Sequence, residues 1–176
     1  MPDLLVAIDL QSAFAHPESP WFTPGLEEVA RRVERLLPRF QRRTVFTRFV
    51  PPLEPFGSWI RYYEKWPFAL DPAAAWLWSV DTRFTAHRTI SSHTFSKWVP
   101  ELRALVGDGE VVLTGVSTEC CVLMTALAAV DDGVPVRVVA DACAAKDRKT
   151  HDNALALMAT RAPQLRMTTL AEELRA

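Results

Sequence analysis

The amino-acid sequence predicts an α/β fold in which a mainly parallel sheet is covered by helices on both faces. Apolar or β-branched runs alternate along the chain with segments of helical periodicity, which is the pattern of βαβ units. The first run, Leu4 to Ile8, is continuously apolar, as expected of a central strand buried on both faces. A chain of 176 residues suits one domain, residues 1–176, with a sizeable core.

The amino-terminal half is expected to contain three strands and one helix. After the strand at residues 4–8, the helix at 25–37 has one apolar stripe, with its charged residues on the other faces. Pro38 is expected to end this helix. β-Branched and aromatic residues favour a second strand over residues 43–50. Residues 87–91 are the third strand candidate.

The carboxy-terminal half continues the alternation. A short helix is expected from Lys97 or Trp98 to residue 106, with Ser96 as its N-cap. The helix at 150–160 is expected to turn three apolar residues toward the core, Leu155, Leu157 and Met158. The remaining expected elements are strands at 110–115, 134–140 and 165–167 and helices at 119–130 and 168–174.

An aromatic-rich excursion separates the second and third strands, and it is too long and too apolar for a plain connection. It is interpreted as a lid over a substrate pocket, as an oligomer contact, or as both. Exposed aromatic side chains at this density would be a liability on a monomer, so a homo-oligomer, dimer or tetramer, is expected. The aromatic residues are Phe56, Trp59, Tyr62, Tyr63, Trp66, Phe68, Trp76 and Trp78.

Composition excludes several classes of protein. The net charge is −1 and no basic block is present, so no nucleic-acid partner is expected. No charged amino-terminal region precedes an apolar one, and no apolar stretch is long enough to span a bilayer, so no membrane association is expected. Three cysteines, two of them adjacent, make no disulfide framework, which fits a reducing, cytoplasmic location.

Two thiols, Cys120 and Cys121, lie where an expected strand leads into an expected helix. The free N–H groups and the positive end of the helix dipole at such a place favour a thiolate. The same N–H groups could hold the oxyanion of a tetrahedral intermediate. The alternative is that these free cysteines are small buried hydrophobes. A redox role for the adjacent pair is a further alternative, although the usual spacing is Cys-x-x-Cys.

Asp9 lies just past the carboxyl end of the first expected strand, where open α/β sheets keep their ligands. An aspartate at this place can also simply cap the following turn. Because the cysteine pair follows another strand in the same way, we expect Asp9 and the thiols to share one site.

Three segments resemble the isochorismatase-like cysteine hydrolases. Residues 5–14 are similar to the family's opening IDMQNDF motif, residues 115–122 to its G-x-x-T-x-x-C-V signature, and residues 138–142 to a later strand ending in Asp-Ala. The resemblance implies a three-layer α/β/α sandwich with a doubly wound, mainly parallel, Rossmann-like sheet. It also implies a small-molecule substrate.

The resemblance further implies a Cys-Asp-Lys triad. Cys121 matches the nucleophile and Asp9 the aspartate that takes the thiol proton, while Cys120 occupies a variable position. The family has a cis peptide bond before its signature threonine, which here corresponds to the bond between Val116 and Ser117. That bond would turn the Ser117 N–H toward the Cys121 N–H to form an oxyanion hole.

The triad lysine departs from the family pattern. The family's lysine normally ends the third strand, and the matching position here is Thr89, or Ser91 or Ser92 with a shorter loop. One hypothesis is that Lys97, or His93 as a substitute, supplies the positive charge from another backbone position. The competing hypothesis is an incomplete triad in a catalytically impaired protein that acts in binding or scaffolding.

A second departure concerns metal. The nicotinamidase branch of the family carries an Asp-x-His-x-x-His metal site after the second strand, whereas residues 46–52 here hold no histidine or aspartate. His16 and His151 have no ligand-like spacing. No metal and no cofactor are therefore expected, and nicotinamide is not the expected substrate.

The leading prediction is a metal-free hydrolase of a small amide, carbamoyl or related substrate, with a Cys121 thiolate and Asp9 as general base. Isochorismatase itself cleaves a vinyl ether, so the family resemblance leaves the bond open. Four aromatic residues are expected to form the pocket walls, with core or interface positions as the alternative: Phe14, Trp59, Tyr63 and Trp66.

Overall fold

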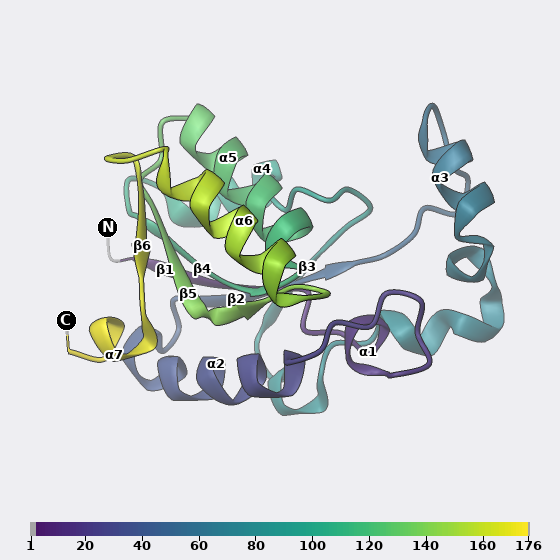
Figure 1. Cartoon of the computed structure of the whole chain (residues 1–176), viewed down its shortest axis with the longest axis horizontal. Coiled ribbons are helices and arrows are strands. Elements are labelled where there is room, and N and C mark those ends of the chain that lie inside the picture. The colour runs from purple at the N-terminus through teal and green to yellow at the C-terminus, as the bar shows by residue number, and fades with distance from the viewer. Residues whose placement is uncertain (1–2, 176) are drawn as a thin grey trace.

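The computed structural model describes residues 3–175 and contains one six-stranded sheet in the order β3-β2-β1-β4-β5-β6 (Figure 1). All neighbouring strands run parallel. The order reverses between β1 and β4, so the crevice above their carboxyl ends is where a doubly wound fold places its ligands. The strands are β1 Leu4–Ile8, β2 Thr44–Phe49, β3 Arg88–Ser92, β4 Val111–Val116, β5 Val136–Ala144 and β6 Leu165–Thr168.

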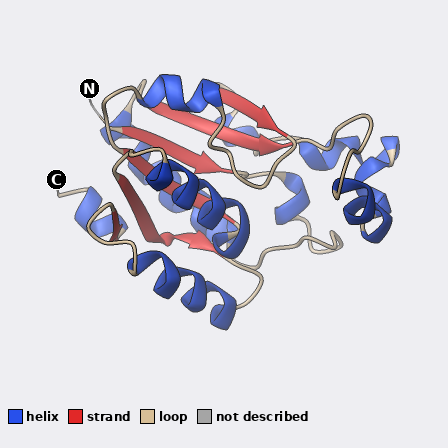
Figure 2. Ribbon diagram, turned by 90° about the horizontal axis from the view of Figure 1, so that it is seen from above, coloured by secondary structure: helices blue, strands red, loops and turns tan. Residues whose placement is uncertain are grey.

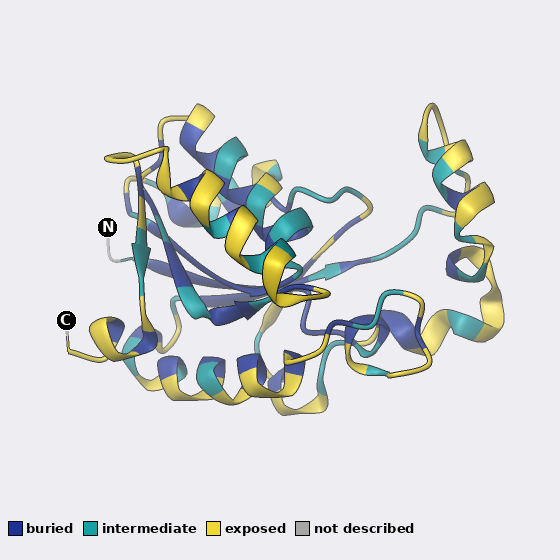
Figure 3. Cartoon of the chain, in the orientation of Figure 1, coloured by how far each residue is buried: buried dark blue, intermediate teal, exposed yellow. Residues whose placement is uncertain are grey.

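Helices cover both faces of the sheet and confirm the predicted three-layer α/β/α sandwich (Figure 1). One face carries α4 Pro100–Val106, α5 Leu123–Asp131 and α6 Arg148–Ala159, while the other carries α2 Leu26–Phe40 and α7 Leu170–Glu173. Both layers bury their apolar stripes against the sheet, which lies as a buried band between half-exposed helices (Figure 3). All residues of β1 and β4 are buried, which accounts for their continuous apolar runs.

Three expectations about helices are wrong. Pro38 does not end α2, which continues to Phe40, because the buried Leu36 and Phe40 hold the last turn against the sheet. The helix α4 begins at Pro100, whose fixed φ suits a first helical position, so Ser96 is not its N-cap. In α6, Leu157 is 44% exposed, because Ala154 and Met158, one turn apart, occupy the buried stripe.

The aromatic excursion lies at the carboxyl ends of the strands, the side toward which the arrowheads point in Figure 2. It contains α3 Trp59–Lys65 and 3₁₀ helices at Pro67–Leu70, Pro72–Trp78 and Thr82–Phe84. Gln11, which immediately precedes the short helix α1 Ser12–Ala15, connects to the excursion through an antiparallel bridge with Val80. The Gln11 amide nitrogen donates to the carbonyls of Phe49 and Trp78 at 2.9 Å each, and its oxygen accepts the Phe49 N–H at 2.7 Å.

Part of the excursion remains exposed, including Leu53, Phe56, Ile60 and Trp76. A homo-oligomer that covers this surface stays a prediction. Across residues 3–175, none of the helices combines the length and the apolar character needed to cross a bilayer.

Gly115 allows β4 to approach β1 closely at the edge that carries the site. Its φ is +111°, and an added Cβ would lie 2.1 Å from the Ile8 carbonyl oxygen. Ile8 immediately precedes Asp9, so this approach sets the position of the aspartate relative to the segment after β4.

We expect Gly115→Ala to lower the free energy of unfolding by about 3 kcal/mol or more, since overpacking against backbone adds to the cost of a positive φ. Gly133→Ala is the matched control, because Gly133 also has a positive φ of +76° but no atom within 4 Å of an added Cβ. It should lose only about 1–2 kcal/mol. Urea unfolding measures both variants, and equal losses would contradict the steric account.

Candidate active site

Asp9 follows β1 directly and is fully buried. Its φ is +50°, which turns the chain sharply at the end of the strand. Thr47 on β2 fixes the carboxylate, since the Thr47 hydroxyl donates to Oδ1 at 2.8 Å and accepts the Asp9 N–H at 3.3 Å. The second oxygen, Oδ2, is therefore the one available for chemistry.

Lys97 pairs with that second oxygen. Its Nζ lies 3.1 Å from Asp9 Oδ2, and neither side chain is exposed to solvent. The ammonium group also donates to the Thr94 carbonyl at 2.8 Å and lies 4.9 Å from the centre of the Phe49 ring. Oδ2 receives no aligned hydrogen bond from any residue in the described range, although it lies within ion-pair distance of the ammonium. The oxygen can therefore accept a proton while the lysine charge stays beside it.

Lys97 reaches Asp9 from the loop between β3 and α4 rather than from the strand. The other candidates from that region do not lie at the carboxylate. His93 is exposed and packs against the Phe56 ring, with the ring centres 5.7 Å apart. Ser92, on β3, hydrogen-bonds to the Thr94 hydroxyl at 2.7 Å.

Cys121 lies in a π-helical turn, Thr118–Val122, between β4 and α5. Its side chain is almost fully buried, at 4% exposed. The peptide bond between Val116 and Ser117, just before the turn, is cis, as the family resemblance implies.

A single buried hydroxyl ties the cysteine turn to the lysine loop. Thr125 donates to the Cys121 carbonyl at 2.6 Å and accepts the Lys97 N–H at 2.8 Å. At the start of the turn, Thr118 shares a hydrogen bond of 2.9 Å with His151 Nδ1 on α6. Thr125 and His151 were not predicted as site residues, because a lone threonine or histidine in a helical pattern carries no local signal of such a contact.

The two thiols differ in acidity. The hydrogen bond with Cys120, burial and the Asp9 carboxylate raise the pKa of Cys121 well above its ordinary value, while Lys97 acts in the opposite direction. The same hydrogen bond lowers the pKa of Cys120. A raised pKa favours the thiol form of Cys121, so attack on a carbonyl calls for a base that removes its proton.

A cavity of about 310 Å³ opens beside the two thiols. Phe14 and Trp66 line it, whereas Trp59 and Tyr63 are absent from its lining and pack among the surrounding rings. The remaining lining residues are Pro20, Trp21, Phe22, Thr23, Phe49, Tyr62, Phe95, Ser117, Glu119, Cys120, Cys121 and Lys146. Five aromatic members of this wall were not predicted as site residues, because they come from four separate segments that only the fold brings together.

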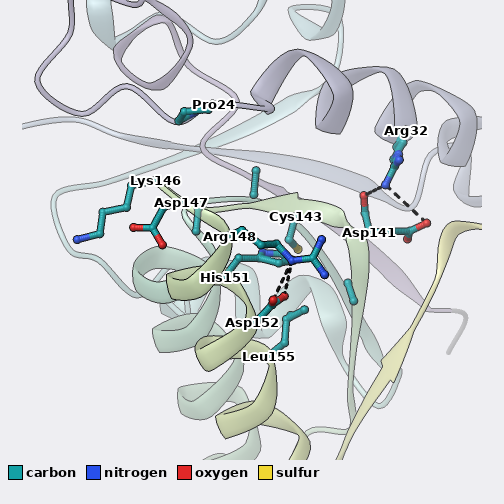
Figure 4. Close-up of a pocket in the computed structure, with 13 residues that line it drawn as sticks. Pro24, Arg32, Asp141, Cys143, Lys146, Asp147, Arg148, His151, Asp152 and Leu155 are labelled. Atoms are coloured by element: carbon teal, nitrogen blue, oxygen red, sulfur yellow. Dashed lines mark hydrogen bonds and ion pairs between the residues drawn. The ribbon is translucent and has the colours of Figure 1, made fainter.

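A second cavity, of about 450 Å³, lies between α2, β5 and α6, and it shares Lys146 with the first (Figure 4). Four of its charged side chains form two ion pairs, Arg32 with Asp141 and Arg148 with Asp152. Its one thiol, Cys143, is buried, and burial raises the pKa of Cys143 to about 12. This cavity therefore offers no activated nucleophile.

Metal-ligand geometry is a separate question. Within residues 3–175, no group of three or more histidine, cysteine, aspartate or glutamate side chains is arranged to hold a metal ion. His151 is engaged with Thr118, and His16 packs edge-on against the Trp76 ring, with the ring centres 5.2 Å apart.

Comparison with known proteins places this arrangement in a family. The Isochorismatase domain family matches residues 3–172. Isochorismatase domain-containing protein 2 of Xenopus laevis is 26% identical over 149 residues, which cover 82% of this chain and 62% of that protein. The chain thus spans less than two thirds of the length of this curated relative.

Solved structures share the fold. A cysteine hydrolase from Pseudomonas syringae pv. phaseolicola 1448A has a TM-score of 0.83 at 18% identity, covering 98% of this chain and 91% of that chain. N-carbamoylsarcosine amidase from Thermoplasma acidophilum has a TM-score of 0.73 at 20% identity, covering 97% of each. Since the domain match extends over nearly the whole sequence, the chain belongs to the isochorismatase family of hydrolases.

Proposed function

We propose that the protein is a metal-independent cysteine hydrolase of a small amide, carbamoyl or related substrate. The observation that carries this proposal is the fully buried ion pair between Asp9 and Lys97, beside the Cys121 turn and at the carboxyl edge of the sheet. A buried carboxylate with a lysine at 3.1 Å is costly to maintain as packing alone, which favours a chemical role. The names of the two structural relatives, a cysteine hydrolase and an amidase, agree with this reaction class.

The reaction begins when Asp9 Oδ2 accepts the Cys121 proton and the sulfur attacks the substrate carbonyl carbon. The N–H groups of Ser117 and Cys121 stabilise the oxyanion that forms on the carbonyl oxygen. The protonated Asp9 then gives its proton to the departing amine, and a thioester remains on Cys121. A water molecule, deprotonated by Asp9, attacks the thioester and releases the acid together with the thiol.

Lys97 keeps the site neutral when the sulfur becomes negative, because its ammonium group stays beside Asp9 throughout the cycle. The alternative, a catalytically impaired scaffolding protein, assumed that the triad has no cation because the third strand lacks a lysine. The position of Lys97 beside Asp9 supports a complete triad instead. The redox alternative is less favoured because Cys120 and Cys121 are adjacent, whereas the usual redox spacing is Cys-x-x-Cys.

The test is to trap the acyl intermediate. Wild-type protein is mixed with a panel of small activated amides, carbamates and esters, quenched in acid and analysed by intact-mass and peptide mass spectrometry. We expect an acyl adduct on Cys121 that decays in water, and its absence in Cys121→Ala. Cys120→Ala should still form the adduct. An adduct confined to Cys120, or none across the panel, would overturn the proposal.

A further inference from the structure

Glu119 lines the cavity beside the two thiols and is not used by the proposed hydrolysis. Its oxygen Oε2 has almost no surface open to water and accepts no hydrogen bond from any residue of the described chain. Burying a carboxylate oxygen without a partner costs free energy, unless a positive charge lies nearby. A cationic group in the adjoining cavity would supply that charge without having to touch Oε2.

The remaining wall around this carboxylate is mainly aromatic. Trp21 lies at its centre, with ring-centre distances of 5.7 Å to Phe49, 6.0 Å to Tyr62 and 6.2 Å to Trp66. Aromatic faces together with a carboxylate are the surroundings that attract an organic cation, because the ring faces carry negative charge density. A carboxylate ligand would instead meet Glu119 and the negative faces of these rings.

One cation, Lys146, also lines the cavity and opposes this preference. Lys146 is exposed and lies where the cavity borders its neighbour, so water and salt screen its charge more than that of the buried Glu119 oxygen. Glu119 is therefore the less screened of the two charges that line the cavity.

We propose that Glu119 selects substrates that carry a cationic nitrogen group on the part held by the aromatic wall. The inference rests on the proposed function, in that it takes this cavity as the substrate site. Glu119 acts as a specificity residue, and the chemistry at Cys121 does not depend on it.

The test uses bromoacetamides as probes, so that it reports the cavity without requiring turnover. One probe carries a trimethylammonioethyl group, a second the neutral 3,3-dimethylbutyl group of the same shape, and a third ends in a carboxylate. The second-order rate of Cys121 alkylation is measured by peptide mass spectrometry and divided by the rate with free cysteine. We expect the cationic probe to react about tenfold faster than the neutral one, and the anionic probe to react slowest.

Three variants assign the selectivity. Glu119→Gln should bring the ratio of cationic to neutral rates close to one. Lys146→Gln should keep or raise the ratio. Asp108→Asn, which removes one negative charge from an exposed position at the opposite edge of the sheet, should leave it unchanged.

A ratio near one in the wild type, a faster anionic probe, or an unchanged ratio in Glu119→Gln would overturn the role of Glu119. These outcomes are separate from the fate of the proposed hydrolysis, which depends on the acyl adduct. Selective alkylation without any acyl adduct would keep the cationic preference and remove the hydrolase.

Discussion

The Cys121→Ser variant is expected to lose about 10⁴-fold or more in kcat/KM, measured on whichever member of the substrate panel the wild type hydrolyses fastest. A serine hydroxyl is far less acidic than a thiol, so Asp9 cannot generate a comparable nucleophile from it. The substitution is nearly isosteric in a buried site, so the free energy of unfolding should change little by comparison. Activity and urea unfolding are measured on the same preparation.

Cys120→Ala is the matched control, because it removes the neighbouring thiol from the same turn and the same cavity. It should keep most of the activity. Loss of activity in Cys120→Ala with retention in Cys121→Ser would show that Cys120, and not Cys121, is the nucleophile.

Lys97→Met is expected to lower the free energy of unfolding by about 3–5 kcal/mol, because it leaves the Asp9 carboxylate buried without its partner. It should also abolish measurable hydrolysis, since a thiolate at Cys121 would then face Asp9 with no cation nearby. Chemical denaturation and the activity assay measure the two effects separately.

The double variant Asp9→Asn/Lys97→Met separates stability from catalysis. Removing both charges should recover most of the lost stability, because no buried ion remains unpaired. Activity should stay absent, since no base is left for the thiol. A double variant as unstable as Lys97→Met, or a Lys97→Met protein with full activity, would contradict the assigned roles.

The fold could be predicted because its determinants are local. The short, continuous apolar runs of β1 and β4 are typical of strands buried on both faces, and the alternation with helices implied a parallel sheet. Pro38 misled the prediction because the packing of Phe40 on the sheet outweighs the local preference of proline to end a helix.

The site could be predicted only in part. Asp9 follows β1 directly and Cys121 lies in the turn after β4, so their place at this edge of the sheet could be predicted from the sequence. Lys97 reaches the carboxylate from a loop whose path depends on Thr125 in a distant helix, and no periodic pattern records that contact. The aromatic wall around Trp21 likewise forms only when separate segments fold together.

The pH dependence of Cys121 alkylation by iodoacetamide tests most directly whether Asp9, Lys97 and Cys121 form one site. Only the thiolate reacts, and the pKa of Cys121 is raised, so its alkylation should reach half-maximum above the ordinary cysteine value of about 8.5. Removing the neighbouring negative charge in Asp9→Asn should shift the midpoint to lower pH, and removing the positive charge in Lys97→Met should shift it higher. His93→Ala should leave the midpoint unchanged. Coincident profiles for the wild type, Asp9→Asn and Lys97→Met would contradict the shared site.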